Sequence, residues 1–325
     1  MAKKHYTSVA IILSGLLFIV FWRHLPVEVS GSRPGNVPML IFFNALVAIT
    51  LGVFSTFILM LFINKSYTLG LFSTLGRFRH LLFLMVKRDF VTRYRRSILG
   101  ILWSLLNPLL TMLVLTMVFS TIFRFDIEYY PLYLLSGQLI FNFFNESTTL
   151  AMGSVTGSAN ILKKVYVPRY VFPLSRILSS VVNLLFSFLA FMIVFIILGH
   201  QWYWTMLLVP VAIIYIFIFA LGIGMLLSAL AVFFRDINYI YTIGTTLLMF
   251  LTPIFWPVSI LEPRVYHLIY MNPMFHFVNY FREVALFGNV PGLWPNILCL
   301  TFAMAAFGVG LAVKIKQQDK YILYL

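Results

Sequence analysis

The sequence is poor in charge and in cysteine. Only 10% of its 325 residues are charged and 62% are hydrophobic, whereas soluble globular domains carry about 25% charged residues. A water-soluble fold is therefore excluded. The single cysteine, Cys299, excludes an intramolecular disulfide and a cysteine-based metal cluster.

Several signatures of enzymes and of self-powered transporters are also missing. No G-x-x-x-x-G-K-[ST] segment occurs, so this chain does not bind ATP through a P-loop, and no G-x-S-x-G nucleophile motif is present. The six histidines show no metal-ligand spacing. We expect no catalytic residue, no metal and no cofactor in this chain. Glu146 is the one clear acid in a predicted span, so active transport would draw its energy from a partner.

Long hydrophobic runs are abundant. Eight apolar stretches, uncharged apart from Glu146, suit membrane-crossing helices, at residues 8–22, 37–63, 97–123, 132–162, 177–199, 205–234, 237–260 and 294–313. The first could also be a cleaved signal peptide, but Trp22-Arg23-His24 is a poor cleavage context. We expect a retained anchor helix there. The predicted fold class is an all-α polytopic membrane protein.

The net charge of +14 is distributed unevenly over the predicted topology. With a cytoplasmic N-terminus, 18 of the 23 Lys and Arg residues fall inside and five outside, namely Arg23, Arg33, Arg124, Arg264 and Arg282. The positive-inside rule selects this orientation. Both termini are therefore predicted to be cytoplasmic, and the basic charge indicates topology and a partner face rather than nucleic-acid binding.

A stripe of polar residues runs along the predicted helix 132–162. A polar stripe that faces lipid is costly, so this one should face protein or a water-filled path. Two interpretations are open: hydrogen bonding that holds helices together, or the lining of a translocation path. The stripe, whose members recur at helical spacing, comprises Gln138, Asn142, Asn145, Glu146, Thr149 and Gly153, and the first five are the candidates for the path.

Aromatic residues cluster near the predicted outer boundary of the membrane. Tyr133 and Trp256 are representative of this cluster. Indole and phenol rings favour the membrane interface, which explains most of them. Because sugar rings stack on aromatic faces, we also consider Tyr133 and Trp256 as candidates for a polysaccharide path.

The most basic stretch of the chain, residues 67–97, has the pattern of an amphipathic helix. Leu71, Leu75, Phe78, Leu82 and Met85 recur on one helical face. Such a helix suits the cytoplasmic interface, with its apolar face in the acyl boundary. The alternative to simple lipid anchoring is a lateral gate or a partner contact. The gate candidates are Arg88, Arg93, Tyr94, Arg95 and Arg96.

Two connections are unusual. The predicted cytoplasmic loop 162–178 reads LKKVYVPRYVFPLSRIL, in which Pro168 and Pro173 interrupt helix and Pro173 can begin one. A solvated basic loop is the simple interpretation. The outer segment 258–290 is too apolar for a free loop and too polar for a span, so short re-entrant helices are expected there.

Pairs of small residues predict close contacts between helices. Gly153-x-x-x-Gly157 and Gly224-x-x-x-Ser228 have the small-xxx-small spacing that allows two helix backbones to approach each other. The pattern is common in helical bundles and says little about function.

Four motifs, in order, resemble the permease subunits of ABC-2-type exporters, especially those that move lipid-linked polysaccharides such as O antigen, capsule or teichoic acid. The resemblance covers roughly residues 70–316. The motifs are Arg93-Tyr-Arg-Arg-Ser-Ile-Leu-Gly-Ile-Leu-Trp103 with Asn107-Pro108, Lys163-Lys164-x-Tyr-Val-Pro168-Arg169, Phe233-Phe234-Arg235-Asp236, and Asn272-Pro273 followed by Tyr280-Phe281-Arg282.

The resemblance implies a six-helix ABC-2, type V exporter-like core with an N-terminal amphipathic interface helix, here preceded by two extra transmembrane helices. The expected organisation is an N-terminal hairpin at 1–66, an interface helix at 67–97, a core at 98–318 and a cytoplasmic tail at 319–325. Within the core, 162–178 would be a coupling loop and 258–290 the outer re-entrant region.

The resemblance also implies partners and a substrate. A homodimer would work with two copies of a cytoplasmic ATP-binding subunit, which binds ATP and Mg²⁺, and would export lipid-linked polysaccharide across a bacterial plasma membrane. The alternatives are a permease for a smaller amphiphile, an ATP-independent channel, or a membrane enzyme acting on polyprenyl-linked sugars. The ATPase-coupling residues implied are Lys163, Lys164, Tyr166, Pro168, Arg169, Arg235 and Asp236.

Overall fold

The computed structural model describes residues 65–95, 98–122, 127–158, 167–234, 236–261 and 266–317. Most of the predicted N-terminal hairpin and the tail 319–325 lie outside these ranges. The same holds for five of the predicted site residues, which are Arg96, Lys163, Lys164, Tyr166 and Arg235.

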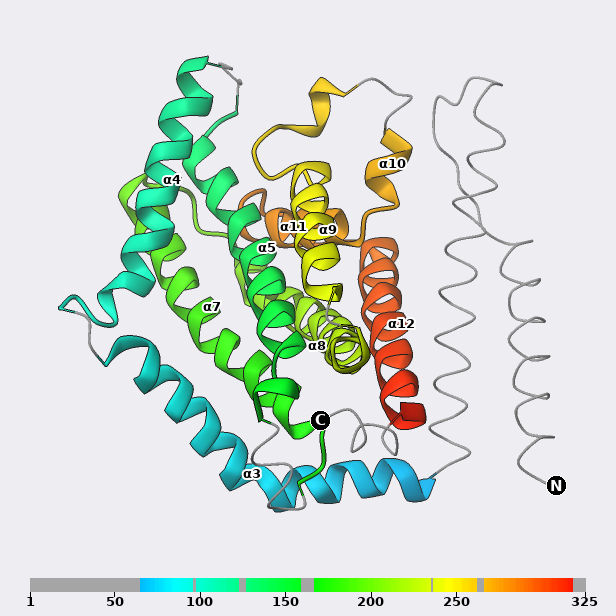
Figure 1. Ribbon diagram of the computed structural model, residues 1–325. Helices are drawn as coiled ribbons and strands as arrows, with labels where there is room; N and C mark the ends of the chain where they lie inside the picture. Colours follow the sequence, from blue (N-terminus) through cyan, green and yellow to red (C-terminus); the bar gives the residue numbers. More distant parts are fainter. Residues whose placement is uncertain are drawn as a thin grey trace, which may run out of the picture.

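The described residues form helices and no strand, so the all-α prediction is confirmed (Figure 1). Short 3₁₀ turns occur at Thr156–Ser158, Trp204–Leu208 and Val258–Ile260. The helices are α3 (Lys65–Tyr94), α4 (Leu102–Ile122), α5 (Tyr130–Met152), α7 (Val171–Ile197), α8 (Val209–Phe233), α9 (Ile237–Leu251), α10 (Tyr266–Tyr270), α11 (Pro273–Ala285) and α12 (Leu293–Gln317).

Among the described residues, four segments are both long and apolar enough to cross a membrane: 102–119, 171–197, 204–233 and 293–313. They correspond to α4, α7, α8 with the turn before it, and α12. Helix α9 is apolar but shorter. Helix α5 is also long, with 23 residues. It is not among these four segments, because it carries the polar stripe.

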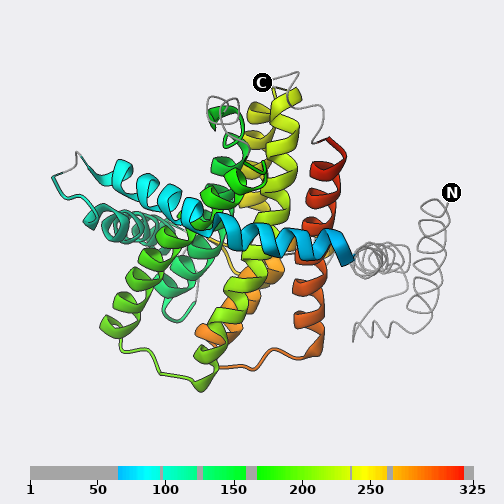
Figure 2. The ribbon, with the colours of Figure 1, turned by 90° about the horizontal axis from the view of Figure 1, so that it is seen from below.

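Helix α8 occupies the centre of the bundle. It packs most extensively on α12 and also contacts α5 and α7. Helix α3 lies along the lower edge in Figure 1, across the lower ends of α5 and α7, and Figure 2 shows it crossing the bundle. Helices α10 and α11 fall within the range 258–290 predicted to be re-entrant, and α11 packs on α5, α8 and α12.

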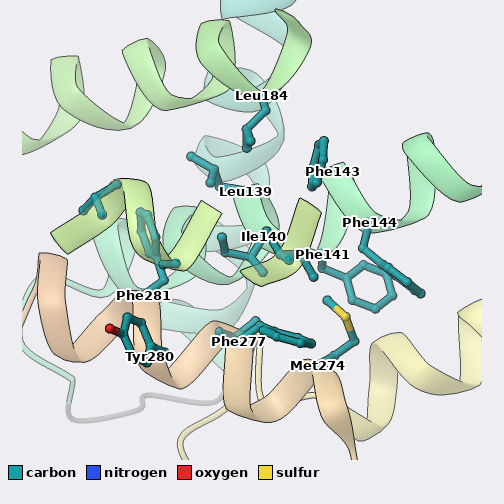
Figure 3. Packing of buried hydrophobic residues seen from close by; sticks show 14 of the residues in the cluster. Leu139, Ile140, Phe141, Phe143, Phe144, Leu184, Met274, Phe277, Tyr280 and Phe281 are labelled. Atoms are coloured by element: carbon teal, nitrogen blue, oxygen red, sulfur yellow. The ribbon is translucent and has the colours of Figure 1, made fainter. Parts of the chain in front are cut away.

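The apolar core joins α5, α7, α8, α11 and α12. Figure 3 shows side chains of α5, such as Phe141 and Phe144, together with Leu184 of α7 and Phe277 and Met274 of α11. The free Cys299 of α12 is fully buried in the same cluster. Because α11 contributes to this core, the segment before α12 is an integral part of the fold and not an outer loop.

Two helices end earlier than the predicted spans. Helix α9 ends at Leu251, because Pro253 has no N–H and disfavours helical geometry at the residue before it; Thr252 is accordingly extended (φ −93°, ψ 129°). Helix α5 ends at Met152, where the segment GSVTGS is rich in residues of low helix propensity.

The small-residue prediction was right for one pair of positions and wrong for the other. A Cβ at Gly224 would lie 2.9 Å from the Cβ of Ala151 and 3.0 Å from Cδ1 of Ile177, so α8 closely approaches α5 and α7 there. No described atom lies within 4 Å of a Cβ placed at Gly153 or Gly157. That pair stands in a turn after α5, where it forms no helix–helix contact.

Candidate functional site

The polar stripe of α5 lines one cavity of about 740 Å³, here called the stripe cavity. Five of the six predicted stripe residues line it, whereas Gly153 follows the end of α5 and does not; α3, α4 and α7, with one further residue of α5, supply the remaining walls. Those walls consist of Arg93 of α3, Trp103, Ser104, Asn107, Pro108 and Thr111 of α4, Leu150 of α5, and Asn183 and Ser187 of α7.

The stripe residues differ in how they are held. Gln138 is buried, Asn145 and Glu146 are half-buried, and Asn142 and Thr149 are exposed. The Asn142 side chain forms no hydrogen bond with any described residue. A side-chain amide that held two helices together would have a hydrogen-bond partner on the neighbouring helix. The exposed part of the stripe is therefore a polar surface that faces the cavity, and not a contact between helices.

Glu146 connects three helices. Its Oε1 lies 2.7 Å from Nη1 of Arg93 on α3, and the side-chain amide of Asn183 on α7 donates a hydrogen bond to the same oxygen. Both charged side chains are partly exposed, so the ion pair itself contributes about 0.2–1 kcal/mol at most to stability. Its main effect is to fix α3 beside the stripe.

A second ionic contact ties α3 to the start of α7. Oδ2 of Asp89 lies 2.8 Å from Nη1 of Arg176, and the Ser179 hydroxyl donates to the same carboxylate oxygen at 3.2 Å. Asp89 and Arg93 are four residues apart and hence lie on the same face of α3. Arg176 belongs to the predicted coupling loop 162–178, so that segment is joined directly to the interface helix.

The apolar face of α3 packs on protein in its described part. Leu82 and Met85 are buried against Val167, Val171 and Phe172. The sequence-based expectation that this face lies in the acyl boundary is wrong for these two residues. The reason is that the coupling-loop segment supplies an apolar surface of its own.

The predicted gate residues do not act as one group. Arg93 reaches the stripe cavity, whereas Arg88 pairs with its neighbour Asp89 at 3.1 Å. Arg95 is exposed just after α3. Tyr94 is the last residue of α3, and its side chain lies outside the described part of the structure.

The described coupling residues lie at helix starts. Pro168 and Arg169 immediately precede α7 and are half-buried, and Asp236 immediately precedes α9 and is exposed. These positions are next to the ends of two long helices, where a displacement of the loop would be passed to a helix axis.

Tyr133 and Trp256 are not in the stripe cavity. The Tyr133 hydroxyl donates to the carbonyl oxygens of Trp256 at 3.1 Å and Pro253 at 3.4 Å. Tyr130, one turn earlier, donates to the carbonyl oxygen of Phe255 at 2.7 Å. The two tyrosines thus hold the irregular segment 252–257 that follows α9.

Arg282 binds the same irregular segment. Charge counting placed it among the outer cations, and the structure shows it as a buried residue of α11, within the range predicted to be re-entrant. It is 3% exposed. Its guanidinium donates to Oγ of Ser136 and to the carbonyl oxygens of Tyr133, Pro253 and Ile254, at 2.6–3.2 Å. No acidic side chain in the described residues pairs with it. The missed signal is Pro253, because a broken helix end leaves carbonyl oxygens that a buried donor must satisfy.

Known proteins resemble this chain over most of its length. The O-antigen export system permease protein RfbA of Klebsiella pneumoniae is 29% identical over 254 residues, which cover 77% of this chain and 97% of that protein. Its namesake from Myxococcus xanthus is 30% identical over 68% of this chain and 86% of that protein. The capsule polysaccharide export inner-membrane protein CtrC of Neisseria meningitidis is 24% identical over 72% of this chain and 90% of that protein.

The profile of a transporter family matches residues 80–286, a range that contains the interface helix from His80 onwards, the polar stripe and Arg282. The chain belongs to the ABC-2 type transporter family.

Proposed function

We propose that this chain is the membrane-spanning permease subunit of an ATP-driven exporter that moves lipid-linked polysaccharide from the cytoplasmic to the outer side of a bacterial plasma membrane. The observation that carries the proposal is the stripe cavity, a polar surface on a helix of a membrane protein that stands open beside the interface helix. The names of the relatives, O-antigen and capsule export permeases, supply the substrate class.

In this proposal the chain crosses the membrane several times with both termini in the cytoplasm. Helix α3 then lies in the cytoplasmic interface, and its basic residues face anionic headgroups. The lipid anchor enters laterally next to α3, and the glycan follows along the stripe. Exposed Asn142 and Thr149 offer hydrogen-bonding groups to sugar hydroxyls along this path.

A separate cytoplasmic subunit, present in two copies, binds ATP and Mg²⁺ and supplies the energy. Its movement is received by the coupling loop 162–178. From there the Arg176–Asp89 ion pair transmits the displacement to α3. Helix α3 carries it to the stripe cavity through the Arg93–Glu146 pair. A rigid helix with two ionic contacts four residues apart is suited to this transfer.

The working unit in this proposal is a homodimer. Helices α4 and α9 support it, because no residue of 102–119 is buried in the chain and Thr245 is the one buried residue of α9. Along α9, Ile243 and Leu247 line an apolar groove. On α4, Leu113 and Met117 are likewise exposed. A second copy would cover these two faces and enclose a path between the subunits.

The experiment that tests the function copurifies the chain with the ATPase encoded by a neighbouring gene. ATP turnover and glycan export are measured for the wild type and for Asp89→Asn, with Arg77→Gln as control. Arg77 is also on α3 but is exposed. We expect Asp89→Asn to retain the complex and to lose export several-fold, while Arg77→Gln resembles the wild type.

Three outcomes contradict all or part of the proposal. Absence of any complex with the ATPase removes the exporter function. Export that persists without ATP turnover indicates a channel. Export of a small amphiphile and of no glycan would show that the proposed substrate class is wrong.

A further inference from the structure

A second polar cavity, here called the outer cavity, lies between the segment before α5, the connection from α7 to α8, and the end of α11. Its volume is about 380 Å³. It shares no lining residue with the stripe cavity. The residues that matter for its chemistry are Glu128, Tyr129, His200, Gln201, Tyr203 and Phe287.

Three rings in this cavity stand at steep angles to one another. The rings of Tyr129 and His200 lie 4.8 Å apart at 67°, and those of His200 and Tyr203 lie 6.1 Å apart at 73°. Such a set presents ring faces in more than one direction. Aromatic side chains provide large, stiff contact surfaces at a small entropic cost.

Polar groups stand among the rings. The Tyr203 hydroxyl donates to Oε1 of Gln201 at 3.5 Å, a long bond that a better partner can replace. The carboxylate of Glu128 is an acceptor in the same lining, and the Gln201 amide both donates and accepts. Hydroxyl groups are matched by this mixture of acceptors and donors. A phosphate is not, because the described part of the lining contains an acid and no Lys or Arg.

The backbone holds the rings in place at some cost. Tyr129 is the only described residue other than glycine with a positive φ (54°, ψ 46°), a conformation that costs an L-residue free energy and is often found at functional positions. Gly288 also has a positive φ, of 67°, and a Cβ there would lie 2.5 Å from Cδ1 of Tyr203. The Tyr203 ring can occupy its present position only because residue 288 is a glycine.

We propose that the outer cavity binds one or two pyranose residues of the glycan. The inference rests on the proposed export function. The C–H faces of a sugar pack on the rings, and its hydroxyls bond to the carboxylate and amide. The volume is at the low end of ligand sites, which fits a short piece of glycan rather than a lipid-linked whole. Tyr133 is in the lining as well. A bound sugar would therefore contact one of the residues that hold the irregular segment 252–257.

The test measures sugar binding directly. The full-length chain is placed in lipid nanodiscs, and saturation-transfer NMR is recorded with hexoses, 6-deoxyhexoses and N-acetylhexosamines. The variants are Gln201→Ala, which removes the amide, and Gly288→Ala, which displaces the Tyr203 ring. Leu207→Ala is the control, because Leu207 is exposed close by and does not line the cavity. Asn142→Leu reports on the stripe cavity in the same way.

We expect saturation transfer from the wild type and from Leu207→Ala, and binding about tenfold weaker in Gln201→Ala, the loss expected for one hydrogen bond. Gly288→Ala should weaken binding as well. The inference is overturned if no sugar in the panel binds the wild type, or if binding falls in Asn142→Leu and not in Gln201→Ala. Failure of the export function appears separately, in the ATP turnover and export of the complex, so a working exporter without sugar binding at this cavity overturns this inference alone.

Discussion

The guanidinium carbon of Arg282 lies 3.5 Å from the centroid of the Tyr133 ring. The same arginine bonds to the carbonyl oxygen of Tyr133 and to those of Pro253 and Ile254. One side chain of α11 therefore joins α5 to the irregular segment after α9. Arginine suits this place because its planar fork of five donors can satisfy several acceptors at once.

Replacing Arg282 with Ala is expected to lower the stability of the folded chain severely. The change removes a donor from three buried carbonyl oxygens: those of Tyr133 and Pro253 keep the hydroxyls of Ser136 and Tyr133 as donors, and that of Ile254 loses its guanidinium partner. A buried group left unsatisfied costs about 1–3 kcal/mol. Arg282→Lys keeps the charge but not the fork, so its loss should be smaller. The measurement is the midpoint of thermal unfolding in detergent. Arg77→Ala, an exposed arginine on α3, is the control, and equal midpoints for Arg77→Ala and Arg282→Ala would contradict the assignment.

Replacing Asn142 with Leu separates the two interpretations of the polar stripe. Asn142 is exposed in the stripe cavity and has no hydrogen-bond partner among the described residues. We therefore expect unchanged folded yield and a several-fold loss of export, because a leucine removes polar surface from the path. Full export with a normal yield would exclude Asn142 from the path.

Reversing the charges of the Arg93–Glu146 pair tests the link between α3 and α5. Arg93→Glu and Glu146→Arg alone each place like charges at the position of the native ion pair, and each should reduce export. The double variant restores an attraction and should recover part of the activity. Glu146→Ala is expected to reduce export more than it reduces expression. If yield and export instead fall together, Glu146 serves to hold the helices together.

Replacing Gly222 with Ala should separate α8 from α12. A Cβ at this position would lie 2.2 Å from the carbonyl carbon of Ala306, which is backbone and cannot move aside. Overpacking of this kind costs about 1–3 kcal/mol or more. Gly76→Ala is the matched control, since no described atom lies within 4 Å of a Cβ there and alanine favours the helix. The readout is thermal stability in detergent, and the prediction fails if the two variants are equally stable.

A bulky residue on α9 tests the proposed dimer. Ile243 is 70% exposed. A tryptophan at this position would fit against lipid, but it would clash with a closely packed partner subunit. We expect a shift from dimer to monomer in light scattering of the purified chain. Leu189→Trp, on the exposed side of α7, should leave the assembly unchanged. A dimer that survives Ile243→Trp is built on another surface.

Sequence patterns located the polar stripe correctly, because helical spacing decides which residues share a face. Five of its six members meet in the stripe cavity, and the sixth, Gly153, lies beyond the end of α5. The pattern could not show what stands opposite that face. Arg93 and Asn183, which bring α3 and α7 to the stripe, are distant from Glu146 in sequence, and only tertiary packing pairs them with it.

Sequence patterns did not reveal the burial of Arg282 or the surroundings of the α3 face, for a common reason. Counting charges assigns each cation to a side of the membrane, but it does not register that a proline-broken helix leaves acceptors that a buried arginine can satisfy. An amphipathic pattern likewise shows that Leu82 and Met85 share a face, but lipid and the side chains of Val171 and Phe172 are equally apolar surroundings for it.

The fully buried Cys299 has a practical consequence for following the movement of the chain. It is the one thiol in the sequence, and it is shielded from water-soluble reagents by the packing of α12 on α8. A cysteine introduced at an exposed position will therefore react with a maleimide label ahead of the native one. Pairs of labels on α3 and α9 can then report, by fluorescence transfer or spin–spin distance, how far the interface helix travels during a transport cycle, in a chain that is otherwise unaltered.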